Sequence, residues 1–126
     1  MESKELKENE KLELERTKLL LCSENIIGYT STIIFFIVIF CSILGNYSDL
    51  ESTVFVILGT LVFIVGISFA LRIEQIAGYY KCSKCEHIYV PDNYLKFSMA
   101  PHIGRTRYMK CPKCDEKSWQ KKVLNK

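Results

Sequence analysis

The sequence predicts a membrane α-helical hairpin followed by a small β domain. Two observations lead to this fold class. Two uncharged apolar runs lie close together before residue 72, and four cysteines lie as two close pairs in the basic segment that follows. The 126 residues accordingly divide into a charged segment over 1–25, a hairpin over 26–71 and a carboxy-terminal domain over 72–126.

The two apolar runs cover residues 26–44 and 54–71, with nineteen and eighteen residues and no charge in either. Each is close to the roughly 20 residues that cross the hydrocarbon core of a bilayer. A helix in the core of a small soluble protein would keep a polar stripe for water, and neither run has one. We therefore expect two transmembrane helices. A cleavable signal peptide is not expected, because the segment before the first run is long and acidic.

The positive charges on either side of the runs predict the orientation. Five Lys and Arg residues precede the first run, none lies in the loop over 45–53, and twelve follow the second run. Since basic loops stay in the cytosol, both termini are expected on the cytosolic side of the cell membrane. No charged residue lies within either run, which argues against a channel or transporter.

Local patterns describe the helices further. Residues 1–21 place acids and bases three or four apart, which predicts a solvated helix, with polar residues 23–25 restarting it as the first span. Leucines in this segment also recur at intervals of seven residues, as in a coiled coil, so a homodimer is the alternative. Gly59, Gly66 and Ala70 share one face of the second span, and small residues on one face favour close helix packing.

The cysteine pairs predict a metal site. Cys82 with Cys85 and Cys111 with Cys114 form two C-x-x-C turns, and two such turns complete the tetrahedron that Zn²⁺ prefers. Four thiolates leave no open position for water, so one structural zinc is expected. A redox pair and an iron–sulfur cluster are the alternatives.

Short alternating runs flank the two turns and predict strands at 79–81, 88–90, 107–109 and 119–124. With CSKC and CPKC, this arrangement resembles the zinc-ribbon family over residues 79–124, and the resemblance implies one zinc clamped at the end of a short sheet. The chain departs from the family where Glu86 and Asp115 stand at the position often held by Gly. A ribbon behind a membrane hairpin is similar to small membrane proteins of Gram-positive bacteria, largely without assigned function, which implies location and no catalytic residue.

The segment between the cysteine pairs is the candidate contact surface. A strand over 93–99 would place Leu95, Phe97 and Met99 on one side, where they would form part of a core beside a loop or, alternatively, contact lipid or a partner. Anion contacts are expected from basic residues of this segment and of the tail: His102, Arg105, Arg107, Lys121 and Lys122. From residue 72 onward twelve basic residues face five acidic ones, which favours an anionic membrane surface.

These observations favour a non-enzymatic, membrane-anchored adaptor or regulator that binds a membrane or cytosolic protein, or an anionic lipid headgroup. No catalytic constellation is visible. One alternative is a membrane-tethered nucleic-acid binder, which the lack of an evident aromatic stacking surface disfavours. The others are an accessory subunit of a membrane enzyme or exporter and a self-immunity protein against a membrane-active peptide.

Overall fold

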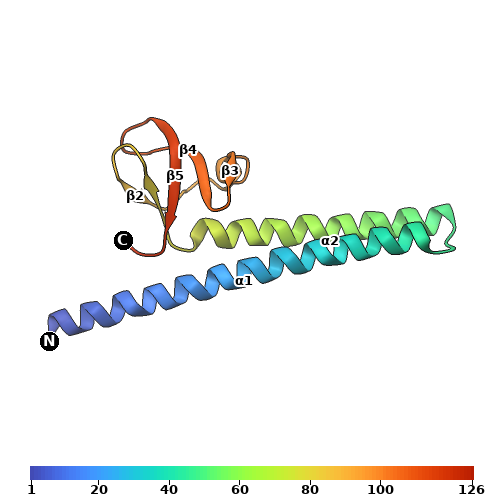
Figure 1. The fold of residues 1–126 in the computed structure, drawn as a ribbon, viewed down its shortest axis with the longest axis horizontal. Coiled ribbons are helices and arrows are strands. Elements are labelled where there is room, and N and C mark those ends of the chain that lie inside the picture. Colours follow the sequence, from blue (N-terminus) through green and yellow to red (C-terminus); the bar gives the residue numbers. More distant parts are fainter. The chain divides into compact units, whose positions relative to one another are not determined.

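The computed structural model describes all 126 residues, as two long helices followed by a small antiparallel sheet (Figure 1). The chain forms two compact units: residues 22–71, and residues 1–21 together with 72–126. Two long apolar helices and a small antiparallel sheet are compatible with the predicted fold class. The elements in order are α1 (Glu2–Leu44), α2 (Asp49–Ile76), β1 (Tyr79–Cys82), β2 (Ile88–Tyr89), α3 (Tyr94–Ser98), β3 (His102–Ile103), β4 (Thr106–Lys110) and β5 (Lys117–Val123).

Both long helices exceed their predicted bounds. Helix α1 runs through residues 23–25 without the expected restart, because that stretch contains neither Pro nor Gly to break it. Helix α2 begins five residues early, where Ser48 and Glu51 form a capping box: the Glu51 N–H donates to Ser48 Oγ (3.4 Å), and the Ser48 N–H to Glu51 Oε2 (3.0 Å). It ends before Gly78, whose positive φ of 69° suits glycine.

The hairpin in residues 22–71 packs through small residues. A Cβ on Gly59 would lie 2.9 Å from Val38 Cγ1, and one on Gly66 would collide with the Ser31 hydroxyl. The predicted packing face is therefore confirmed, and it is used within the chain. Phe35 and Phe63 add a stacked pair of rings 4.8 Å apart.

The outside of the hairpin is apolar. In the most apolar 18-residue stretch of each helix, none of α1 and 11% of α2 is buried, and both helices are long and apolar enough to cross a membrane. Hydroxyl groups in these stretches are satisfied within their own helix, since Thr32, Ser42 and Thr60 each donate to the carbonyl four residues earlier. The two helices therefore present no unpaired hydroxyl at these positions.

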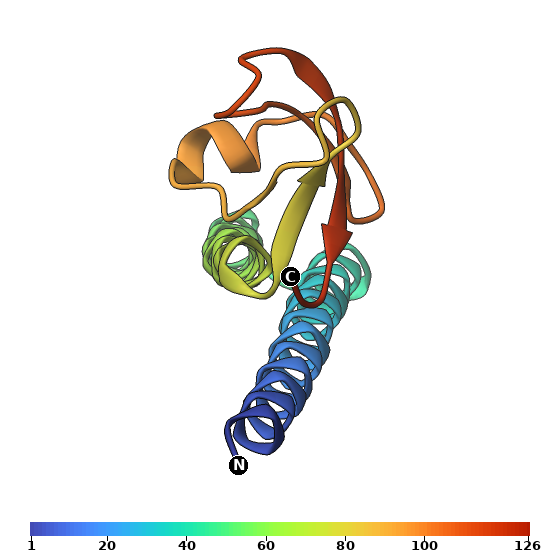
Figure 2. The ribbon, with the colours of Figure 1, turned by 90° about the vertical axis from the view of Figure 1, so that its left-hand side faces the viewer.

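The sheet has the strand order β2-β1-β5-β4-β3 with antiparallel pairing throughout. Figure 2 shows β1 and β5 side by side. The predicted strands are confirmed, and alternation along them makes two faces. The inner face carries the buried residues Tyr80, Cys82, Arg107, Ser118 and Gln120. The outer face carries Lys81, Tyr108, Lys117, Trp119 and Lys121, as the pairs Lys81–Lys121 and Tyr108–Trp119 show.

The strand predicted over 93–99 is wrong, because α3 forms there instead. Asn93 caps this helix, with its side-chain oxygen accepting the Lys96 N–H at 3.0 Å. Phe97 is buried while Leu95 and Met99 are exposed. In a helix, residues four apart share one side, so the three side chains separate instead of lining up as they would in a strand.

Candidate metal centre

The sulfur atoms of Cys82, Cys85, Cys111 and Cys114 lie within 4.8 Å of one another. Cys82 Sγ is 3.8 Å from Cys114 Sγ, and Cys85 Sγ is 3.6 Å from Cys111 Sγ. A disulfide would bring two sulfurs to about 2.05 Å, whereas four sulfurs bonded to one tetrahedral zinc at about 2.3 Å stand about 3.8 Å apart. The group is therefore able to bind a metal ion such as zinc.

The two cysteine turns are built alike. In each turn the backbone N–H two residues after the first cysteine donates to its sulfur, from Lys84 to Cys82 and from Lys113 to Cys111, both at 3.4 Å. Such donors stabilise a thiolate, which is the form that binds metal. Hydrogen bonds from the backbone N–H groups of Cys85 and Lys84 and from the Ser118 hydroxyl lower the pKa of the Cys82 thiol.

Each turn closes on a residue in the left-handed region. Glu86 has φ 58° and Asp115 has φ 61°, so the two acids adopt the conformation for which glycine is the usual choice. Both form an ion pair with the lysine that precedes their turn: Lys81 Nζ lies 3.4 Å from Glu86, and Lys110 Nζ lies 2.7 Å from Asp115. Glu86 and Asp115 therefore keep the turn geometry that glycine usually provides, and each adds a paired charge at the edge of its turn.

The two cysteine turns are alike because the sequence around them repeats, and the repeat extends beyond the C-x-x-C pattern itself. Residues 79–86 read YYKCSKCE and residues 108–115 read YMKCPKCD, so a tyrosine, two lysines and a final acid recur with the cysteines. The hydrogen bonds repeat as well, since the amides of Cys82 and Cys111 donate to the carbonyls five residues later at 2.9 and 3.0 Å. Comparison of the two segments would have indicated the paired lysines and acids.

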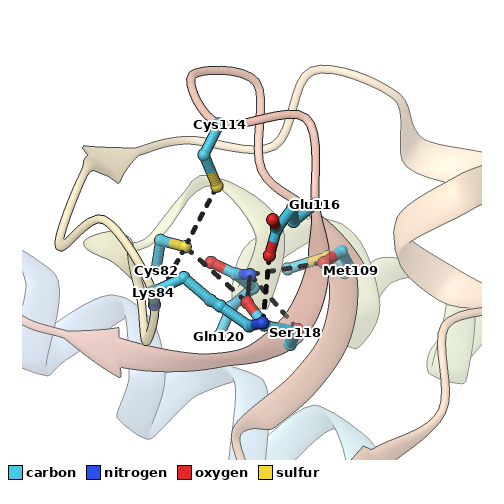
Figure 3. Close-up of polar contacts among 7 residues, drawn as sticks. All are labelled: Cys82, Lys84, Met109, Cys114, Glu116, Ser118 and Gln120. Carbon is cyan, nitrogen blue, oxygen red and sulfur yellow. Dashed lines mark hydrogen bonds and ion pairs between the residues drawn. The ribbon is translucent and has the colours of Figure 1, made fainter.

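Polar side chains of the inner face lie next to the sulfurs (Figure 3). Ser118 Oγ is 3.6 Å from Cys82 Sγ and 2.7 Å from Gln120 Nε2, which also donates to the Met109 carbonyl at 3.3 Å. At the edge of the site Lys84 and Glu116 form an exposed ion pair at 3.0 Å. The chain thus orients one cysteine through a side-chain hydrogen-bond network, as is usual for metal ligands.

The histidines do not join this group. His87 stacks on Tyr89, with ring centres 5.9 Å apart and planes 8° from parallel, and His102 lies exposed in β3. Burial raises the pKa of the Tyr89 hydroxyl. The cluster is therefore made of sulfur alone, as the sequence predicts.

A buried ion pair connects the end of α2 to the sheet. Arg107 Nη2 lies 2.7 Å from Glu74 Oε2, and the two side chains are 1% and 7% exposed. The Tyr80 hydroxyl donates to Glu74 at 3.0 Å, and Arg107 Nη1 donates to the Phe97 carbonyl at 3.0 Å. The guanidinium carbon also lies 4.0 Å from the centre of the Phe97 ring. The charges of Glu74 and Arg107 therefore neutralise each other, and their hydrogen-bonding groups find partners inside the domain.

The expectation that Arg107 contacts an external anion is therefore wrong. Its carboxylate partner is Glu74, which precedes it by 33 residues. The predicted strand placed Arg107 correctly, but strand alternation turns its side chain to the inner face. The short-range pattern shows neither which face is covered nor that the end of α2 covers it.

The other predicted contact residues differ in their placement. Lys122 Nζ binds the Glu74 carbonyl and lies 4.4 Å from the centre of the Tyr80 ring, so this lysine points inward. Lys121 and His102 are exposed, and Arg105 is partly exposed in the turn after β3. The structure does not gather the five residues into one site.

Comparison with protein-family models, with curated proteins and with solved structures finds no match to this chain.

Proposed function

We propose that this protein is a membrane-anchored zinc module: a non-enzymatic adaptor or regulator whose ribbon-like domain holds one structural Zn²⁺ at the inner surface of the cell membrane. One observation carries the proposal. The four clustered sulfurs belong to a domain whose core includes Glu74 and Gln75. These two residues lie in the last turn of α2, an apolar helix long enough to cross a membrane.

The hairpin supports the anchoring role. Its apolar side chains point outward over both long helices, as in the exposed Phe36, Phe40, Leu61 and Phe69. A core helix of a soluble protein would be mostly buried, whereas lipid accepts such a surface without cost. The distribution of Lys and Arg supports a cytosolic position for both termini.

The donor set supports a structural ion. Four protein sulfurs fill a tetrahedral shell, whereas a catalytic zinc keeps a position for water. The domain also keeps a positive charge, because its twelve basic residues outnumber five acids and the two net negative charges of a zinc bound by four thiolates. An adaptor that binds an acidic protein surface or anionic headgroups agrees with this balance.

Metal analysis of the full chain in detergent tests the zinc assignment. We expect about one zinc per chain, lost in Cys111→Ser. Cys41→Ser is the matched control, because Cys41 lies outside the cluster. Iron in place of zinc would favour the iron–sulfur alternative, and full zinc retention by Cys111→Ser would overturn the proposed site.

Labelling of intact cells tests the topology. A membrane-impermeant thiol reagent should modify Ser48→Cys in the loop between the helices and leave Lys126→Cys unmodified, with Cys41→Ser as the background. Reaction at Lys126→Cys would place the domain outside the cell and overturn the proposed location.

A second candidate, the membrane-tethered nucleic-acid binder, gains support from the outer face. The rings of Tyr108 and Trp119 lie 5.5 Å apart there and are 38% and 40% exposed, an aromatic pair that the sequence did not make evident. Lys117 and Lys121 flank it on the same face. Exposed aromatic rings beside lysines suit stacking on single-stranded nucleic acid. Salt-sensitive binding of a fluorescent oligonucleotide that Trp119→Ala abolishes would favour this candidate, and no binding would remove it.

A further inference from the structure

Three large apolar side chains are strongly exposed on the segment between the cysteine pairs. Leu95 in α3 and Met99 at its carboxy-terminal cap are 68% and 79% exposed, and Ile103 in β3 is 73% exposed. Scattered exposed apolar residues are ordinary, but Leu95 and Met99 stand four residues apart on one side of a helix. We propose that this apolar tip, formed by Leu95 and Met99, inserts into the headgroup layer of the membrane that the hairpin spans.

The position of α3 along α2 supports this occupant. Leu71 is the last residue of the apolar run, and Arg72 begins the polar end of the helix. The Arg72 guanidinium lies 6.0 Å from the centre of the Tyr94 ring, at the first residue of α3. One turn further on, Gln75 Nε2 donates to the Pro91 carbonyl at 2.6 Å. The segment that leads into α3 is therefore held against the first polar turns after the proposed span.

This contact sets the depth of the tip. A residue just beyond the apolar run lies at the boundary between the hydrocarbon and the headgroups. Tyr94 contacts that residue, and tyrosine is enriched at this depth. Leu95 follows directly, so its exposed side chain starts from the same level. A lipid surface covers the tip at that depth without a further protein partner.

Charge near the tip favours anionic lipid. Between residues 91 and 106 the sequence has Lys96 and Arg105 and one acid, Asp92. Lys96 is exposed in α3 beside Leu95. Interfacial membrane contacts typically combine an apolar side chain that enters the interface with a neighbouring basic side chain that reaches the lipid phosphate.

The inner side of α3 attaches the helix to the domain, which leaves the tip free to contact lipid. Phe97, on the other side of the helix, is buried and packs edge-to-face on Tyr80 at 5.8 Å. The domain is therefore held by Phe97, and Leu95 and Met99 are not needed for its core. Their replacement should change membrane contact and leave zinc binding unchanged.

The inference rests on the proposed anchoring, and tryptophan fluorescence of the full chain in lipid nanodiscs tests the two separately. The probe is Leu95→Trp in a Trp119→Phe background, and the wild-type chain, whose single tryptophan lies on the outer face, is the matched comparison. Lipids brominated near the headgroup end of the acyl chain quench only tryptophans at that depth. Phe40→Trp in the same background reports on the proposed span.

We expect at least a twofold greater quenching of Leu95→Trp than of Trp119, with a blue-shifted emission that strengthens when anionic lipid is added. Water-like emission and no quenching at position 95 would overturn the inference, whether the tip is then solvated or reserved for a partner protein. If Phe40→Trp is also unquenched, the proposed anchoring fails. If Phe40→Trp is quenched and Leu95→Trp is not, only the lipid contact fails. Zinc content equal to wild type shows that each variant is folded.

Discussion

The hairpin and the β domain are stabilised in opposite ways. In the hairpin, glycines and a serine lie between the helices and the large apolar side chains point outward. In the β domain, charged and amide side chains such as Glu74, Arg107 and Gln120 are buried, while lysines and aromatic rings lie outside. The first arrangement suits lipid, and the second depends on a few specific polar contacts and on the cysteine cluster. Loss of the metal or of a buried polar contact in the domain should therefore have a larger effect than a change in the hairpin.

Removal of the proposed zinc ion should have the largest effect. A structural zinc contributes on the order of 10 kcal/mol to the folding of a small domain, so a strong chelator should unfold residues 79–126. The fluorescence of Trp119 and the near-ultraviolet circular dichroism would report this loss, while the far-ultraviolet signal of the long helices persists. A folded domain after complete zinc removal would contradict this expectation.

Loss of one partner of the buried ion pair should be next in size. Glu74→Ala leaves the Arg107 guanidinium buried without its carboxylate, which costs about 3–5 kcal/mol. Denaturant titration followed by Trp119 fluorescence measures the change in the free energy of unfolding. Lys84→Ala is the control, because its pair with Glu116 is exposed to solvent and therefore contributes little to stability. Equal effects of the two variants would show that the buried pair has no special role.

An enlarged residue between the helices should have a moderate effect. Gly66→Leu places a side chain where even a Cβ would meet Ser31, and such overpacking costs about 1–3 kcal/mol. Thermal unfolding of the helices in detergent, followed by circular dichroism, would show the loss. Ile64→Leu, at an exposed position of the same helix, should leave the transition unchanged. An unaltered transition for Gly66→Leu would contradict the packing described here.

The smallest effect is expected where the sequence departs from the ribbon pattern. Glu86→Gly relieves a left-handed residue but removes the exposed pair with Lys81. The first change favours the folded domain by about 1 kcal/mol, and the second costs less than that. A small rise in stability is therefore expected in the denaturant titration. Ser83→Gly, which relieves no left-handed residue, should not stabilise the domain.

The same comparison explains what the sequence reveals. The hairpin depends on composition over long runs, and the metal site depends on two short spacings, so both are readable locally. The contact between Glu74 and Arg107 joins residues 33 positions apart, and no local pattern pairs them. For α3, the alternation of Leu95, Phe97 and Met99 fits a strand equally well, and the Asn93 cap decides for a helix. Local periodicity thus fails where a cap or a distant partner determines the outcome.

X-ray absorption spectroscopy at the zinc edge, on the full chain purified from membranes, is the decisive measurement for the proposed zinc site. We expect a first shell of four sulfurs at about 2.3 Å from zinc and no nitrogen or oxygen ligand. A shell that contains nitrogen or oxygen, or a sample whose cysteines bind no metal, would contradict it.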